Sequence, residues 1–335
     1  MLKYIQSLYY YPTEGINTTV NNYPAINSIK AMLIVMIIIT HSLPESMTMY
    51  FMYMFHMPVF LGISGFLLKE SAFKKGLAFY FNKITKRLII PWLFAFAVYL
   101  PFQWSTFTLS NPHDLILFPF YHLWYIPAYI LGSIACYAIY RFKIPVWGML
   151  FVSGVITVTW YLYFRDIHLS IHEQPLYWLG EKRFYCYLFF YILGYAFRNN
   201  LLDIRLTPLI TLFITTTSFL LIALCVFRHM PDYLIVIPYL FFNVSLIIFL
   251  LLFIAHKPIF QNKFWLYINS QSLGIYFYHP LILILIYQLL GDPTKEQVST
   301  ITGLIIGVIT IGLSFILTKA MRKWNFSNRY LLGNL

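Results

Sequence analysis

Charged residues are scarce in this chain of 335 residues. Asp, Glu, Lys and Arg together make up 10% of it, whereas hydrophobic residues make up 60% and the mean hydropathy is +0.71. A single water-soluble core of this length could not bury so much apolar surface, so a soluble enzyme is excluded first. The composition instead predicts a membrane protein.

Cysteine is almost absent, and its placement excludes two further kinds of site. Cys136, Cys186 and Cys225 are odd in number and all lie in apolar stretches. They supply neither a disulfide framework nor the paired spacing of a zinc or redox site. His168 and His172 lack the metalloprotease pattern and are expected in an exposed loop, so no metal is assigned.

Acidic residues are the rarer charged class, with 11 Asp and Glu against 23 Lys and Arg and a net charge of +12. In a soluble domain this excess would suggest binding to nucleic acid. Here the basic residues cluster in short segments between apolar runs, which is typical of cytoplasmic loops. Membrane lipid is therefore the expected partner, and nucleic acid is not.

Apolar runs of the length that crosses a bilayer, about 20 residues for roughly 30 Å of hydrocarbon, recur along the chain. They predict an all-α membrane protein built as a bundle of ten transmembrane helices. The expected spans are 26–44, 50–68, 87–104, 119–140, 145–164, 183–197, 207–227, 233–255, 264–288 and 298–318. This divides the chain into an N-terminal segment (1–25), a transmembrane domain (26–318) and a short tail (319–335), with no cleavable signal expected.

The distribution of positive charge predicts the orientation of this bundle. If the N-terminus is cytoplasmic, eighteen of the 23 basic residues fall in inside segments, and those outside are Arg165, Lys182, Arg183, Arg228 and Lys295. Inside loops retain positive charge during insertion. Both termini are therefore predicted to be cytoplasmic.

Lys30 and His41 are the most informative pair of ionisable residues, because such groups are costly inside a bilayer and mark candidate sites. They lie eleven residues apart in the first expected helix. That is close to three turns, so both side chains project from one face, about 16 Å apart along the axis. The pair could hold two ends of one long ligand. The alternative is a lysine that reaches the interface and a neutral, hydrogen-bonded core histidine.

Three more histidines are expected at a similar depth in the outer half of the bundle. Their contexts are Phe55-His56-Met57-Pro58, His122-Leu123-Trp124-Tyr125-Ile126-Pro127 and Tyr276-Phe277-Tyr278-His279-Pro280. Helix packing is an alternative explanation for the first context, and an interfacial aromatic belt for the second. Together with His41, the four histidines predict a shared polar cavity.

A basic segment follows the second expected helix. It contains Lys69, Lys74, Lys75, Lys83, Lys86 and Arg87, and it leads into Leu88-Ile89-Ile90-Pro91-Trp92. Anchoring to anionic lipid explains such a segment at least as well as recognition of a phosphate-rich ligand does. Both interpretations place it at the cytoplasmic surface.

The order and spacing of these motifs resemble those of the integral-membrane acyltransferase 3 family, especially its fucose 4-O-acetylase-like branch. Lys30-x10-His41 is similar to the family's Arg/Lys-x10-His signature, and the resemblance covers about residues 25–285. The other matching motifs are Phe55-His56-Met57-Pro58, Ile63-Ser64-Gly65-Phe66, Lys86-Arg87-Leu88-Ile89-Ile90-Pro91, His122-Leu123-Trp124-Tyr125-Ile126-Pro127, Phe190 to Tyr195, and Ile275 to Pro280.

The resemblance implies a ten-helix bundle in the bacterial cytoplasmic membrane. The implied reaction moves an acyl group, usually acetyl from cytoplasmic acetyl-CoA, to a hydroxyl of a cell-surface glycan or lipid-linked sugar. The family's essential base would be His41 and its basic partner Lys30. Some relatives carry an extracytoplasmic domain that this chain lacks, so transfer is expected in the membrane part or through a separate extracytoplasmic partner.

The chemistry of the implied reaction suggests roles for the remaining residues. His41 would take the proton of the attacking hydroxyl. Contacts to the oxyanion or the acceptor fall to Trp124, Tyr125, His122, His56 and His279, among which the sequence does not choose. The coenzyme A phosphates would meet Lys30, Lys83, Lys86 and Arg87. The residue that orients His41 stays open between Glu45, Glu173 and Glu181.

Two other function classes use the same residues. A transporter or flippase for a polysaccharide or lipid-linked glycan would line its pathway with them, although the inverted repeats of such proteins are not detected. An assembly or anchoring subunit would need none of them for chemistry. Substitution of His41 distinguishes the three, because only the enzyme loses acyl transfer while export continues.

Overall fold

The computed structural model describes residues 23–102, 113–165, 173, 175–204, 206–291 and 297–334. All regular structure in these ranges is helical, which confirms the all-α prediction. A helix lies in each of the ten expected segments. The main helices are α2 (Ile26–Ser42), α3 (Met47–Phe66), α5 (Ile90–Tyr99), α7 (Tyr125–Phe142), α8 (Val146–Tyr163), α10 (Leu188–Arg198), α11 (Pro208–Phe227), α12 (Asp232–Phe249), α14 (Ser272–Leu289) and α15 (Thr300–Met321).

Seven helical stretches of the described chain are long and apolar enough to cross a membrane. They are Met47–Phe66, Leu77–Phe102, Val146–Tyr163, Pro208–Phe227, Asp232–Ile254, Ser272–Leu289 and Thr300–Met321. The first expected span, Ile26–Ser42, is a shorter apolar helix, and α7 and α10 fill the other two segments. The structure therefore supports a polytopic membrane protein, and the count of ten crossings remains a prediction.

One expected bound is wrong, and one expected helix is interrupted. The third segment begins at Leu77 instead of residue 87, because α4 (Leu77–Ile84), the π-helical turn η3 (Thr85–Ile89) and α5 form one continuous stretch. Lys83, Lys86 and Arg87 therefore lie on a helix. The ninth segment is broken at Gln271, between α13 (Lys263–Ser270) and α14.

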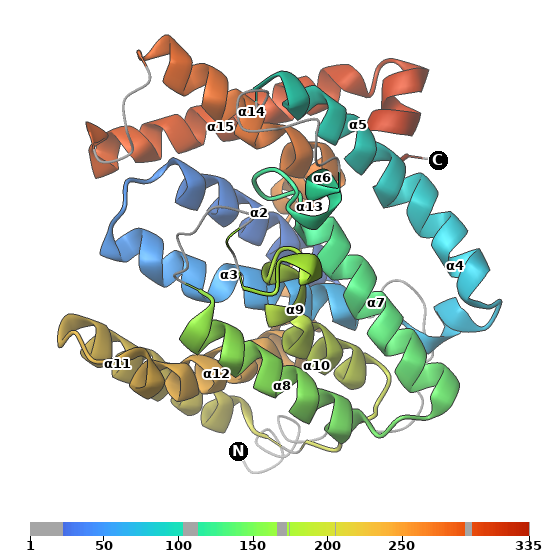
Figure 1. Ribbon diagram of the computed structural model, residues 1–335, viewed down its shortest axis with the longest axis vertical. Coiled ribbons are helices and arrows are strands. Elements are labelled where there is room, and N and C mark those ends of the chain that lie inside the picture. Colours follow the sequence, from blue (N-terminus) through green and yellow to red (C-terminus); the bar gives the residue numbers. More distant parts are fainter. Residues whose placement is uncertain are drawn as a thin grey trace.

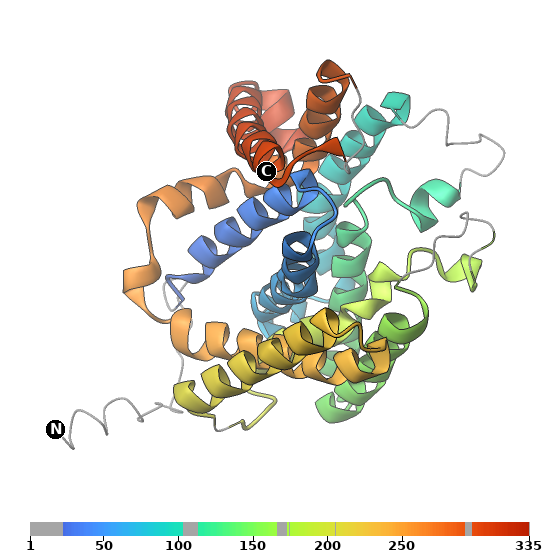
Figure 2. The same cartoon turned by 90° about the vertical axis from the view of Figure 1, so that its left-hand side faces the viewer.

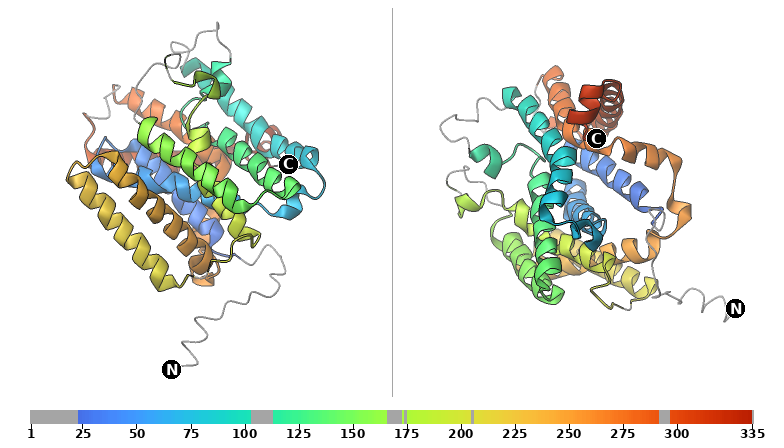
Figure 3. Two further views of the ribbon diagram at one scale, coloured as in Figure 1. Left: turned by 60° about the horizontal axis from the view of Figure 1, so that its bottom comes forward. Right: turned by 90° about the vertical axis from the view of Figure 1, so that its right-hand side faces the viewer.

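The helices are arranged in layers around α2 and α3 (Figure 1). On one side α2 packs against α14 and α15, and on the other α3 packs against α10 and α12. The view from the side shows the same order, with α15 above and α11 below the central pair (Figure 2). Helices α11 and α12 lie side by side on the outside (Figure 3). Helix α11 leaves Leu209 and Phe213 largely exposed, as expected for a face in contact with lipid.

Two helices that carry histidines contain an internal proline, and a side chain from another helix repairs each interruption. Pro58 leaves the carbonyl of Met54 without its helical partner, and Nδ2 of Asn243 on α12 donates to that oxygen at 3.2 Å. Next to Pro280, the buried hydroxyl of Tyr99 donates to the carbonyl of Phe277 at 2.7 Å and accepts from the amide of Leu281 at 3.2 Å. These contacts fix the helical segments on which His56 and His279 lie.

Helices α3 and α10 approach each other through glycine. A Cβ on Gly65 would overlap the carbonyl of Tyr191, and one on Gly194 would overlap the carbonyl of Gly62. Only glycine permits this backbone approach. The contact holds α10 against the histidine-bearing α3, and the short helix that precedes α10, α9 (Arg183–Cys186), packs against α7 and α8.

The end of the chain is packed against the helices. After α15 the turn η10 (Ser327–Leu331) lies against α5, and the buried Leu332 reaches Gly274. Gly333 has a φ of 64°, and its backbone lies against the carbonyl of Arg87. The expected short tail is thus docked beside the basic segment of the third helical stretch.

Candidate active site

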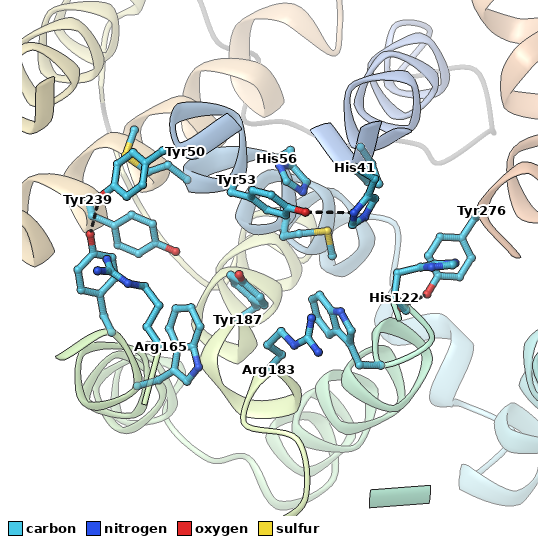
Figure 4. Close-up of a pocket in the computed structure, with 16 residues that line it drawn as sticks. His41, Tyr50, Tyr53, His56, His122, Arg165, Arg183, Tyr187, Tyr239 and Tyr276 are labelled. Atoms are coloured by element: carbon cyan, nitrogen blue, oxygen red, sulfur yellow. Dashed lines mark hydrogen bonds between the residues drawn. The ribbon is translucent and has the colours of Figure 1, made fainter. Parts of the chain in front are cut away.

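A cavity of about 320 Å³ opens among the central helices (Figure 4). Its lining is dominated by histidine, tyrosine and tryptophan, with two arginines. The side chains that line it are Ile37, His41, Tyr50, Tyr53, Met54, His56, Met57, His122, Trp124, Trp160, Tyr161, Arg165, Arg183, Tyr187, Tyr239 and Tyr276. We refer to this cavity as the histidine pocket.

Three of the four expected histidines line the histidine pocket, and the fourth packs directly behind them. The ring of His279 lies 4.6 Å from that of His122 and 5.7 Å from that of His41, centroid to centroid, while His41 and His122 are 6.4 Å apart. Helices α2 and α14 and the segment before α7 thus bring together residues that are far apart in sequence. No group of three or more His, Cys, Asp or Glu in the described chain is arranged to hold a metal ion.

His41 is held by a tyrosine. It lies in the last turn of α2, which ends at Ser42 just before Pro44, and its Nδ1 is 3.1 Å from the hydroxyl of Tyr53 on α3. Figure 4 shows the two side chains turned toward each other. The acids considered from sequence are placed otherwise: Glu45 is exposed and Glu181 pairs with Arg183.

The other histidines have distinct hydrogen-bonding states. Nδ1 of His56 contacts the carbonyl of Met52 at 2.6 Å, and Nδ1 of His279 contacts the carbonyl of Ile275 at 3.0 Å. A carbonyl can only accept, so in both neutral rings Nδ1 carries the proton and Nε2 is an acceptor. Neither nitrogen of the buried His122 has a hydrogen-bond partner among the described residues. A buried polar group in this state fits direct contact with a ligand.

The segment that carries His122 is fixed by its backbone. The indole of Trp92 donates to the carbonyl of Leu123 at 2.9 Å, and the hydroxyl of Tyr276 donates to the carbonyl of His122. Both donors are buried. The imidazole of His122 therefore faces the pocket from a rigid support, while the hydroxyl of Tyr276 is already used.

Arg183 is a site residue that the sequence did not reveal. Its guanidinium lies 5.1 Å from the ring of Trp124, which stacks on Tyr187 at 5.6 Å, and its Nη2 is 2.9 Å from Oε2 of Glu181. Burial disfavours the Glu181 carboxylate, but the bonds and the charge of Arg183 outweigh it and hold the pKa of Glu181 below its usual value. The pair fixes the guanidinium of Arg183 at the wall of the histidine pocket.

A second arginine lies at the opposite end of the pocket (Figure 4). Nη2 of Arg165 is 3.0 Å from both carboxylate oxygens of Asp232, and its guanidinium lies 4.3 Å from the ring of Tyr161. The hydroxyls of Tyr50 and Tyr161 meet nearby at 3.5 Å. The pocket thus runs from a histidine end to an end formed by tyrosine and paired arginine.

The remaining expected residues lie outside this cavity. The hydroxyl of Tyr125 contacts Ser64 at 2.9 Å and does not face the pocket. Lys30 lies on the same unbroken helix as His41 and close enough to Arg87 for their charges to interact, but it does not line the pocket. Lys83, Lys86 and Arg87 are exposed. The cations expected to bind the donor therefore lie apart from the histidines. Helix α2 connects the two groups, because it carries both Lys30 and His41.

The model of the acyltransferase domain of the acyltransferase 3 family matches residues 23–319. The chain belongs to the acyltransferase 3 family. No curated protein and no solved structure matches it. The matched range contains every helix that contributes to the histidine pocket, so this acyltransferase 3 protein carries the pocket within its acyltransferase domain. It is a membrane acyltransferase.

Proposed function

We propose that the protein transfers an acetyl group from acetyl-CoA to a hydroxyl of a cell-surface glycan or lipid-linked sugar in the bacterial cytoplasmic membrane. The observation that carries the proposal is the meeting of His41, His122 and His279 at one end of an aromatic pocket. Acyl transfer to an alcohol needs a general base and a donor for the developing oxyanion. Histidine provides both at neutral pH.

His41 is the base in this proposal. The proposed tautomer has Nδ1–H donating to the hydroxyl oxygen of Tyr53, 3.1 Å away, so that Nε2 carries the lone pair that acts as the base. The hydroxyl oxygen of the sugar attacks the carbonyl carbon of the thioester while Nε2 takes the hydroxyl proton. When the tetrahedral intermediate collapses, the C–S bond breaks and His41 returns the proton to the leaving thiolate. The products are the sugar ester and free coenzyme A.

His122 and Arg183 are suited to the oxyanion. One nitrogen of neutral His122 carries a proton, and neither nitrogen has a partner in the described chain. Arg183 lines the same wall, and because Glu181 balances its charge, its contribution is the N–H donors of the guanidinium that do not bond to Glu181. A preorganised donor at this position acts mainly on the transition state, where the negative charge develops.

The aromatic part of the pocket is suited to a sugar acceptor. Tyr50, Tyr161, Tyr187 and Tyr239 present flat rings with hydroxyl groups, which can cover apolar sugar faces and bond to sugar hydroxyls. Nε2 of His56, which lines the pocket, can accept a hydrogen bond because Nδ1 carries the proton. This combination favours a neutral polyhydroxylated acceptor, since both arginines already have carboxylate partners.

The donor would approach from the other end of α2. Lys30, Lys83, Lys86 and Arg87 offer positive charge for the coenzyme A phosphates. The pantetheine arm would then lie along α2 toward His41. The acceptor would occupy the aromatic part of the histidine pocket, on the other side of His41 from the donor. The two substrates would therefore meet at His41. A separate extracytoplasmic partner could present the acceptor.

Mass spectrometry of surface glycans tests this function. Cells that express the protein should show glycans with an acetyl mass increment, and cells that express His41→Ala should lose the increment while glycan export continues. Blocked export with unchanged acetylation would instead indicate a transporter or flippase. If Lys30→Ala and His41→Ala are both silent, an anchoring subunit is the better interpretation.

A further inference from the structure

A second cavity, also about 320 Å³, lies away from the histidine pocket. Its lining residues are Phe73, Lys74, Gly76, Tyr137, Tyr140, Arg141 and Lys143. They come from the turn η2 (Glu70–Phe73), the loop before α4 and the end of α7. The two helices lie side by side in Figure 1, and the hydroxyl of Tyr80 on α4 donates to Ser133 on α7 at 3.0 Å. We refer to this cavity as the basic pocket.

The walls of the basic pocket are built from packed aromatic rings. Phe73 is 2% exposed, and its ring lies 4.9 Å from that of Tyr80, 5.4 Å from that of Tyr137 and 5.8 Å from that of Tyr140. These edge-to-face and tilted contacts fix the turn against α7. The cavity therefore has rigid walls and is not a gap between mobile loops.

Three cations surround this cavity without a carboxylate among them. Lys74 comes from one wall, and Arg141 and Lys143 come from the other. None of the three forms an ion pair within the described ranges, and all are exposed at the rim. Glu70, the acid of the same turn, interacts with Tyr195 instead. The pocket thus combines uncompensated positive charge with donors for hydrogen bonds.

Two residues at the rim of the basic pocket have a positive φ. Lys143 has a φ of 53° and ends α7 in the left-handed region, so the chain turns there before α8. Gly76 has a φ of 89°, and a Cβ at this position would meet nothing within 4 Å. Both left-handed residues belong to the cavity lining. Glycine adopts a positive φ without strain, and a left-handed residue commonly ends a helix, so these two positions define the turns at the rim.

The basic pocket lies next to exposed aromatic residues, where the apolar outer surface of the helices meets the connecting loops. Phe79, Phe142 and Trp147, next to the cationic residues in sequence, are 52%, 70% and 62% exposed. Exposed aromatic rings beside basic residues are typical of the membrane interface. The charge pattern predicts that this interface is the cytoplasmic one.

We propose that the basic pocket binds a phosphate group, carried either by the headgroup of an anionic lipid or by a soluble phosphate compound. Three unpaired cations from two walls match a tetrahedral anion with several acceptor oxygens. The tyrosine hydroxyls can add donors, and the aromatic walls exclude water from one side. The site is independent of the histidine pocket and of the acyl transfer proposed there.

Binding measurements on the full chain test this proposal. The protein is purified in neutral detergent, and native mass spectrometry compares its retention of phosphatidic acid with that of phosphatidylcholine, while calorimetric titration follows inorganic pyrophosphate. The pocket variant combines Arg141→Gln with Lys143→Asn, since asparagine tolerates the left-handed backbone. The control combines Lys257→Gln with Lys263→Gln, which removes the same charge from exposed positions of the same predicted face.

The pocket variant should weaken phosphate binding by roughly tenfold, because it removes two charged donors, and the control should not. If the pocket variant loses only the binding of phosphatidic acid, the phosphate group belongs to a lipid headgroup. If it loses only the binding of pyrophosphate, the phosphate group belongs to a soluble compound. Lys74→Gln, on the opposite wall, should reproduce the loss if the double variant fails to fold. Equal losses in the pocket and control variants would indicate a diffuse basic surface and overturn the proposal. Absence of binding by the unaltered protein would also overturn it.

Discussion

The hydroxyl of Tyr53 lies 3.1 Å from Nδ1 of His41, so the base proposed for acyl transfer is oriented by a tyrosine of the neighbouring helix. This contact joins the end of α2 to α3, in the turn that precedes His56. A tyrosine can fix the imidazole without placing a negative charge in the membrane.

Loss of the Tyr53 hydroxyl should impair the chemical step. Tyr53→Phe keeps the ring but removes the group that fixes the tautomer of His41, so kcat should fall about tenfold with little change in the KM for acetyl-CoA. Tyr50→Phe is the matched control for kcat: Tyr50 lines the acceptor part of the same pocket one turn earlier on α3, so loss of its hydroxyl should change the KM for the acceptor and leave kcat nearly unchanged. Steady-state kinetics with the purified protein measure both. A kcat equal to that of Tyr50→Phe would contradict the assigned orientation.

The Glu181–Arg183 pair predicts a pH dependence of stability. The folded-state pKa of Glu181 lies below its ordinary value of 4.5, so its contribution is fully present above that value and is lost as the pH falls through the folded-state pKa. The Tm of the unaltered protein should therefore exceed that of Glu181→Gln at neutral pH, and the difference should shrink toward pH 3. Thermal unfolding in detergent checks this. Glu45→Gln, at an exposed position, is the control, and a difference that does not vary with pH would exclude the linkage.

Close approach of α3 and α10 predicts a large effect of one methyl group. Gly194→Ala places a Cβ on the carbonyl of Gly62, so it should destabilise the fold by about 3 kcal/mol or more. Gly312→Ala on α15 meets nothing within 4 Å and should be neutral or stabilising by about 0.5 kcal/mol. A comparison of Tm values separates packing from helix propensity. Similar Tm values for the two variants would refute this packing.

Lys30 should affect donor binding more than catalysis. Lys30→Gln removes positive charge near Arg87, at the end of α2 away from His41, so the KM for acetyl-CoA should rise about tenfold while kcat changes little. Lys319→Gln, an exposed lysine on α15, should leave both parameters unchanged. An unaltered KM for Lys30→Gln would remove this lysine from the donor site.

The sequence predicted much of the fold because hydropathy and charge are local signals. Each expected segment contains a helix, and the eleven-residue spacing of Lys30 and His41 falls on one unbroken helix. The start at Leu77 was missed because basic residues at 83–87 look like a loop, although they occupy a helix with a π-turn. Long cationic side chains can leave a helix surface for water, so charge alone does not end a helix.

Fewer residues of the candidate site could be predicted from the sequence. The histidines could be grouped by their expected depth, but Tyr53 and Arg183 gave no such signal. Arg183 reaches the pocket because its loop docks on a distant segment, where the amide of Glu181 donates to the carbonyl of Leu117 at 2.7 Å. Contacts of this kind depend on tertiary packing, which residue spacing does not encode.

The most direct test of the account is acyl transfer by the purified protein with His41 altered. The protein is reconstituted in lipid with acetyl-CoA labelled in the acetyl group and with a glycan acceptor, and the label in the glycan is measured. His41→Asn should reduce the rate by at least about 100-fold, as expected for loss of a general base, while His229→Asn, at an exposed loop position, should keep the full rate. Label transfer by His41→Asn at the rate of the control would contradict the central claim.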